Sequence, residues 1–103
     1  QTAHLEHRGA ILNLAEATLS VGEEKLSLTK NEFRILQVLM ERKGRVVSRD
    51  KLMERLWETD SFVDDNTLTV NVNRLRKKLA EAGLEDFIAT KKGIGYVIEQ
   101  EQL

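Results

Sequence analysis

The chain has 103 residues, of which 41% are hydrophobic and 32% charged, a composition that predicts one domain with a single modest core. It contains no cysteine, which excludes disulfide scaffolds, thiol chemistry and cysteine-ligated zinc, and no apolar run approaches the roughly 18 residues of a membrane span. Its 16 basic and 17 acidic residues give a net charge of −1, which by itself argues against a nucleic-acid ligand, so the distribution of these charges becomes decisive.

Residues 2 to 28 consist of short apolar stretches separated by turn residues, a pattern typical of a small antiparallel sheet of three or four strands. Gly9 and Gly22 interrupt the pattern. Both histidines, His4 and His7, lie in the first stretch. A gap of three residues places them on opposite faces of a strand, so we expect no metal site there.

Two helices are predicted next, and each begins with a capping residue. Thr29 is followed three residues later by Glu32, which is the capping-box spacing, and apolar residues then recur at helical spacing until Gly44, the expected C′ residue. Ser48 begins a second helix of about ten residues. The apolar positions of the two helices are Phe33, Ile35, Leu36, Leu39, Met40, Leu52, Met53, Leu56 and Trp57.

The segment after the second helix is acidic and irregular, and we interpret it as a loop in which Asp64 or Asp65 caps the next helix. Its carboxylates, including that of Asp60, could instead bind Mg²⁺ or act as an acid–base pair. No histidine, lysine or glycine-rich phosphate loop accompanies them, so we expect capping and solvation. The sequence therefore offers no candidate site for catalysis, and no metal or cofactor is expected.

The third helix, predicted from about Asn66 to Ala82 and ended by Gly83, carries the clearest functional signal. Its core stripe consists of Leu68, Val72, Leu75 and Leu79. The other side exposes an apolar residue and four cations without a single acid, which is unusual for a face that serves only solubility. The members of this side and its shoulders are Asn66, Thr67, Val70, Asn71, Asn73, Arg74, Arg76, Lys77 and Lys78.

These side chains match the chemistry that reads the major groove of double-stranded DNA. Arginine bonds guanine, asparagine bonds adenine, and an apolar group such as Val70 contacts the thymine methyl. Other side chains suit phosphates, which position a protein without reading sequence, namely Thr67, Arg76, Lys77 and Lys78. The alternative is that the four cations only complement the helix dipole and stay solvated.

Residues 87–98 form a second cationic segment without acids, predicted to be a β-hairpin with Lys91 and Lys92 on a glycine turn. Such a hairpin could enter a minor groove beside the docked helix, which favours DNA binding. Trp57 and Tyr96 are either core residues or phosphate contacts through the indole N–H and the phenol O–H. The order of elements predicts an α+β winged helix-turn-helix, with an N-terminal antiparallel sheet, a three-helix core and a C-terminal β-hairpin wing.

The acidic loop suggests a second class of function. For Phe62, packing in the core and contact with a partner are equally open. An exposed Phe62 would form, with Glu58, Asp60, Asp64 and Asp65, a surface complementary to a basic protein partner. The alternative hypothesis is therefore a winged helix that serves only as a protein-interaction module.

Five blocks of the sequence resemble, in order and spacing, the winged-helix effector domain of the OmpR/PhoB family of response regulators. The blocks are Leu28–Leu36, Val46–Leu52, Leu56–Trp57, Val63–Leu79 and Thr90–Tyr96. The resemblance covers nearly the whole chain and implies sequence-specific binding of double-stranded promoter DNA and transcription regulation. We therefore expect residues 1–103, which begin at Gln1 without a signal-like stretch, to be the DNA-binding fragment of a longer cytoplasmic protein.

The resemblance also implies partners. The missing part would be an N-terminal receiver domain, phosphorylated by a cognate sensor kinase, and phosphorylation would promote homodimers on tandem half-sites, with the isolated domain monomeric. The loop from Glu58 to Asp65 would meet RNA polymerase, through Glu58, Asp60, Phe62 and Asp64. The block Val63–Leu79 is most similar to the branch that responds to cell-envelope-active antimicrobial peptides.

Carried over position by position, the resemblance implies that the third helix contacts DNA through Asn66, Thr67, Val70, Asn71, Asn73, Arg74 and Arg76, with Arg74 as the base reader. Trp57 and Tyr96 match phosphate positions, and Thr90 and Lys92 match wing positions. Relatives often have arginine where this chain has Asn66 and Asn73. With few phosphate-neutralising side chains, one copy of the domain is expected to bind DNA weakly.

Overall fold

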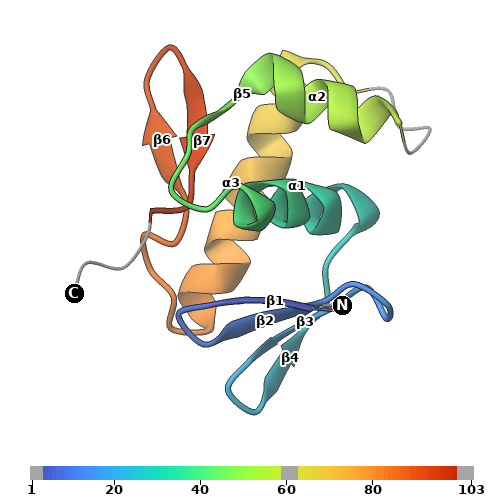
Figure 1. Ribbon diagram of the computed structural model, residues 1–103, viewed down its shortest axis with the longest axis vertical. Helices are drawn as coiled ribbons and strands as arrows, with labels where there is room; N and C mark the ends of the chain where they lie inside the picture. The colour runs from blue at the N-terminus through green and yellow to red at the C-terminus, as the bar shows by residue number, and fades with distance from the viewer. Residues whose placement is uncertain (1–3, 59–62, 100–103) are drawn as a thin grey trace.

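The computed structural model describes residues 4–58 and 63–99, and it places an antiparallel sheet at one end of the molecule (Figure 1). This four-stranded sheet has the order β1-β2-β3-β4, with the bounds His4–His7, Ala10–Asn13, Thr18–Val21 and Glu24–Leu26. Leu12 pairs with Leu19 across β2 and β3, and both side chains are fully buried under the helices. The predicted sheet is confirmed. In β1, His4 is exposed and His7 buried, as opposite faces require.

Three helices follow the sheet in the chain: α1 (Lys30–Glu41), α2 (Arg49–Trp57) and α3 (Asp65–Glu81). The capping box of α1 is confirmed, because the Thr29 hydroxyl accepts from the Glu32 N–H at 3.2 Å and the Glu32 carboxylate accepts from the Thr29 N–H at 2.9 Å. Ser48 caps α2 as predicted. None of the helices in the described ranges has the length and apolar character needed to cross a membrane.

The end of α1 differs from the prediction. The helix ends at Glu41 with Arg42 as its C-cap, so Gly44 stands one position beyond the expected C′ residue. Gly44 adopts the left-handed backbone conformation, with a φ of 86°. In this conformation its N–H donates to the Ile98 carbonyl at 2.8 Å. The glycine therefore turns the chain toward the C-terminal segment rather than closing the helix.

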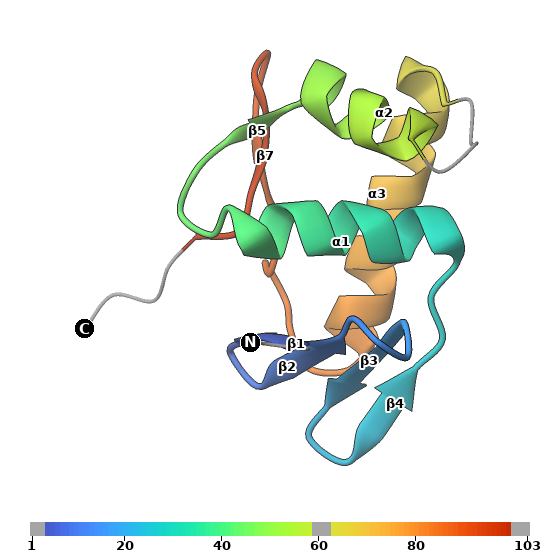
Figure 2. The ribbon, with the colours of Figure 1, turned by 45° about the vertical axis from the view of Figure 1, so that its right-hand side comes forward.

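Helix α3 spans the molecule from α2 to the N-terminal sheet (Figure 2). Its predicted core stripe of Leu68, Val72, Leu75 and Leu79 is fully buried. The helix ends in a Schellman motif, in which the Gly83 N–H donates to the Ala80 carbonyl and the Leu84 N–H donates to the Leu79 carbonyl. Gly83, with φ 95°, ends the helix as predicted.

The wing is the hairpin β6–β7, which pairs with β5 to form a sheet of three short strands with the order β5-β7-β6, bounded by Val47–Ser48, Gly95–Val97 and Ala89–Lys91. The hairpin β6–β7 confirms the prediction, whereas β5 carries no sequence signal because two residues show no periodicity. Tyr96 pairs with Val47 on one side and with Thr90 on the other. The wing is thereby joined to the connection between α1 and α2, and the α+β winged helix-turn-helix is confirmed (Figure 1).

Gly95 is required by this junction. A Cβ at Gly95 would lie 2.0 Å from the Val47 carbonyl oxygen, and backbone atoms of β5 cannot move aside as a flexible side chain can. Gly93, in the turn, has φ 77° but open space around it.

We expect Gly95→Ala to lower the free energy of unfolding by about 3 kcal/mol, because β5 must separate from β7. Gly93→Ala, the matched control, should cost only about 1 kcal/mol, since it strains φ without a clash. Urea unfolding followed by circular dichroism measures both. Equal small losses would show that β5 does not hold the wing.

Candidate nucleic-acid interface

The outer side of α3 presents a continuous polar face with one apolar residue in it. Its exposed members recur at helical spacing: Asn66, Val70, Asn73, Arg74 and Lys77. Val70 is 37% exposed, and neither Arg74 nor Lys77 forms an ion pair with any residue in 4–58 or 63–99. The face thus offers a methyl-bearing group, amides and free cations together, as base edges and phosphates require.

Asn71 does not belong to this face. Its side chain is 7% exposed, and its amide N–H donates back to the Thr67 carbonyl at 2.8 Å. The position follows Leu68 by three residues and precedes Leu75 by four, so it adjoins the core stripe. Asn71 therefore lies at the buried edge of α3, and its predicted contact with DNA stays a prediction.

Lys78 is also turned away from the predicted cationic face. Its Nζ lies 2.6 Å from a carboxylate oxygen of Glu32 and 2.9 Å from the Ser27 carbonyl oxygen. Glu32 is only 1% exposed, so its charge needs this partner. Lys78 therefore joins α3 to α1 through this ion pair, and its predicted contact with phosphate stays a prediction.

Arg76 connects the recognition helix to the wing. One guanidinium nitrogen donates to the Thr90 hydroxyl of β6, and the guanidinium carbon lies 5.5 Å from the centroid of the Tyr96 ring. Tyr96 is buried, so the structure places its ring in the core between these elements. Arg76 therefore fixes the distance between helix and hairpin.

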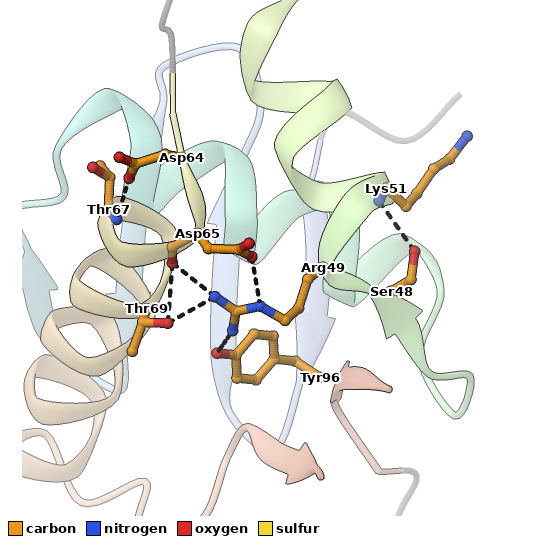
Figure 3. A network of polar contacts seen from close by, with 8 residues as sticks. All are labelled: Ser48, Arg49, Lys51, Asp64, Asp65, Thr67, Thr69 and Tyr96. Carbon is orange, nitrogen blue, oxygen red and sulfur yellow. Dashed lines mark hydrogen bonds and ion pairs between the residues drawn. The ribbon is translucent and has the colours of Figure 1, made fainter. Parts of the chain in front are cut away.

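Arg49, the first residue of α2, makes the densest set of polar contacts (Figure 3). Its Nε donates to the Asp65 carboxylate at 3.0 Å, its Nη2 to the Asp65 carbonyl at 2.7 Å and to the Thr69 hydroxyl at 2.8 Å, and its Nη1 to the Tyr96 hydroxyl at 2.7 Å. Burial disfavours the charge, but hydrogen bonding and attraction to Asp65 and Tyr96 outweigh it and raise the pKa of Arg49.

Sequence reasoning missed Arg49 because its partners lie far from it along the chain. One signal was available. A cation in the first turn of a helix opposes the positive end of the helix dipole, so it is unfavourable unless another element supplies an acceptor. Here Asp65 of α3 supplies it.

The wing has fewer free charges than predicted. Lys91 forms an ion pair with Glu99 at 3.2 Å, just beyond the acid-free segment, whereas Lys92 is exposed and has no ion pair within the described chain. Thr90 is exposed as well, although its hydroxyl accepts from Arg76. Thr90 and Lys92 therefore remain the wing's available contacts.

At the other end of the face, Trp57 is 49% exposed, and its indole N–H donates to the Val63 carbonyl at 3.1 Å. The N–H that was predicted to reach a phosphate is thus bonded to the chain's own backbone, and the ring surface remains accessible. Glu58 is exposed, and its carboxylate Oε1 lies 3.4 Å from the Nε of Arg55. Asp60 and Phe62 of the predicted polymerase contact lie outside the described residues.

Asp64 is the N-cap of α3. Its carboxylate accepts from the Thr67 N–H at 2.8 Å, which lowers the pKa of Asp64 because the bond favours the charged form. The capping prediction is confirmed. Within the described residues, no three His, Asp or Glu side chains gather closely enough to hold a metal ion.

Comparison with known proteins places this geometry in context. A family model described as "Transcriptional regulatory protein, C terminal" matches residues 22–98. The sensory transduction protein BceR of Halalkalibacterium halodurans is 50% identical over 93 residues, which are 90% of this chain and 40% of that protein. The chain spans about two fifths of the length of the curated relatives it matches.

Solved structures show the same fold. The C-terminal domain of the nisin resistance regulator NsrR, a lantibiotic response regulator, is 41% identical with a TM-score of 0.83, covering 95% of this chain and 99% of that one. The DNA-binding domain of Klebsiella pneumoniae RstA, in complex with the RstA box, is 25% identical with a TM-score of 0.80 and covers 95% and 98% of the two chains.

The ion pair between Lys78 and Glu32 predicts a stability effect. Lys78→Met should lower the free energy of unfolding by about 2 kcal/mol, because it leaves a buried carboxylate unpaired. Lys77→Met, the exposed neighbour, should change it by less than about 0.5 kcal/mol. Adding Glu32→Gln to Lys78→Met should recover part of the loss in urea unfolding. A loss that is unchanged in the double variant would contradict the pairing.

The cap at Asp64 predicts a pH effect. Because its pKa is lower in the folded than in the unfolded state, the carboxylate stabilises the fold above about pH 4 and loses this contribution as the pH falls through the folded pKa. Asp64→Asn keeps a neutral cap acceptor. Between about pH 5 and pH 2, unfolding free energy should fall more steeply in the wild type than in this variant, as thermal unfolding at each pH would measure. Parallel pH profiles would refute the link.

Proposed function

The chain belongs to the C-terminal domain family of transcriptional regulatory proteins, whose members include the output domains of OmpR/PhoB-type response regulators, and we propose that it reads specific DNA sequences through α3 and its wing. The family binds DNA and regulates transcription and is not a family of enzymes. The observation that carries the proposal is the unpaired face of α3, in which Val70 lies beside the free cations Arg74 and Lys77.

In this proposal α3 lies in the major groove. Arg74 is the base reader, Val70 contacts a thymine methyl, and Asn66 and Asn73 supply amide donors and acceptors. Lys77 and the half-buried Thr67 contact phosphates and set the register. The structure of the RstA DNA-binding domain in complex with the RstA box, which has the same fold, supports DNA as the ligand.

The wing lies at the adjacent minor groove and offers Thr90 and Lys92. In both views its turn and the N-terminal end of α3 lie toward the same end of the molecule, away from the N-terminal sheet (Figures 1 and 2). Arg76 and Arg49 hold the hairpin to α3 before DNA arrives. A preformed spacing between the two reading elements avoids an ordering cost on binding.

Further partners follow from the family. We propose that the domain works in the cytoplasm as the output end of a longer response regulator, whose receiver domain is phosphorylated by a sensor kinase. The greater length of the curated relatives supports this. RNA polymerase is the proposed partner of the acidic segment that includes Glu58 and Asp64. The likeness to a lantibiotic response regulator supports a peptide antibiotic as the signal.

The small number of free cations supports binding as a dimer. Each phosphate contact contributes to affinity through counterion release, and this face offers few side chains without an internal partner. Two copies on tandem half-sites, each bringing the other to a high local concentration, would restore tight binding. The isolated domain is accordingly proposed to be a weak, monomeric binder.

Sequence reading and phosphate binding are separable by substitution. Selection from a random DNA library first supplies the preferred site. Arg74→Ala should then weaken binding to that site by about 1–3 kcal/mol and relax the preference at one base position. Lys77→Ala should weaken binding to all sequences alike and reduce the slope of log affinity against log salt by about one.

Anisotropy titrations at moderate salt, with the selected site and a scrambled site, measure both effects. Equal affinity of the wild type for the two probes would refute sequence-specific binding. It would favour the alternative, a domain that serves only for contact with proteins.

A further inference from the structure

The tip of the wing carries an exposed apolar side chain that the proposed contacts do not use. Ile94 is 61% exposed, more than the other large apolar residues of the described chain, including Trp57 at 49% and Val46 at 41%. Leaving an isoleucine in water forfeits the free energy its burial would provide. Ile94 lies two residues from Lys92, at the end of the hairpin that is proposed to contact DNA, so it is placed to contact the same ligand.

The backbone around Ile94 is held in one conformation. The Ile94 N–H donates to the Lys91 carbonyl at 2.8 Å and closes a tight turn, in which Gly93 adopts a φ of 77°. On the other side, Gly95 lies against the backbone of Val47 and leaves no room for adjustment. Ile94 is also branched at Cβ, which restricts its rotamers. The apolar group is therefore presented from a defined position.

The wing offers few charges for DNA binding, so an apolar contact there would add affinity. Lys91 is paired with Glu99, so Lys92 is the cation of the turn without an ion pair among the described residues. A lysine is a point charge that neutralises one phosphate and does not fill a groove. Proteins that bind the minor groove frequently insert apolar side chains there, as wedges between base steps, and isoleucine is among the residues used.

We propose that Ile94 packs against the sugar carbons that line the minor groove, while Lys92 binds a flanking phosphate. This inference rests on the proposed function. It assigns to Ile94 an apolar part of the wing's affinity, which does not depend on salt because no counterion is released by it. With Val70 in the major groove, the domain would then hold DNA through one apolar contact in each groove.

The test uses a DNA probe with a single half-site. Ile94→Thr keeps the branch at Cβ and replaces apolar by polar surface, and it should weaken binding about five- to tenfold with an unchanged salt slope. Ile94→Val, the conservative control, should bind within about twofold of the wild type, since it removes only one methylene. Lys92→Met should instead reduce the salt slope by about one. All three should unfold at the wild-type temperature, since both residues are exposed.

Three results would overturn the proposal. Ile94→Thr could bind the single half-site as tightly as the wild type. Its loss could be confined to a probe with two half-sites, which would place Ile94 against a second copy of the domain. Its salt slope could fall like that of Lys92→Met. A wild type that fails to distinguish the selected site from scrambled DNA would overturn the proposed function as well, whereas the three results above leave that function intact.

Discussion

The guanidinium of Arg49 stands where α2, α3 and β7 meet, and the reading surface depends on it. Asp65 and Thr69 come from the first turns of α3, and Tyr96 comes from the wing, so one planar group with fixed donor directions sets three elements relative to one another. A lysine could not bond to all of them at once. Nearer the C-terminal end of α3, Arg76 makes a second connection between this helix and the wing, through the Thr90 hydroxyl. The wing and the recognition helix thus form one rigid unit.

Six cations on or beside α3 and the wing fall into two groups with different roles. Arg49, Lys78 and Lys91 are paired with Asp65, Glu32 and Glu99, and they hold the structure together. Arg74, Lys77 and Lys92 are free of ion pairs within the described chain and face solvent. A net charge of −1 therefore conceals a small cationic surface on an acidic remainder. Counting charges along the sequence overestimates that surface, because some of the cations are consumed inside.

The sequence predicted what local physics determines. The capping box at Thr29, the cap at Asp64 and the glycine stop at Gly83 each involve residues within a few positions of one another, and helical periodicity placed the α3 core stripe correctly. What the sequence did not predict was decided by tertiary contacts. Lys78 was placed on a shoulder of the third helix, but its ion pair with Glu32, 46 residues away in sequence, has no local signal.

The same distinction explains the site. Asn71 sits at the margin of the core stripe, where helical angle alone does not separate exposed from buried, and its bond to the Thr67 carbonyl settles the matter. The strand β5 is too short for a periodic signal in the sequence. Its backbone lies so close to Gly95 that a side chain there would clash with Val47. Residue chemistry indicated a helix for the major groove and a hairpin for the minor groove, and the family resemblance added the assignment of roles to single positions.

A reading surface with few free cations must obtain affinity from another source. Electrostatic contacts weaken steeply as salt rises, because each one depends on releasing a counterion. Apolar contacts carry no such dependence, and the exposed Val70 and Ile94 lie on the two elements that the Arg49 and Arg76 contacts hold in register. Rigid placement matters more for an apolar group than for a charge, since dispersion forces fall off within an ångström of contact whereas Coulomb attraction extends further. The arginine contacts that fix the wing are thus the condition under which a domain with few free cations on its DNA-binding face can use apolar contacts to bind DNA.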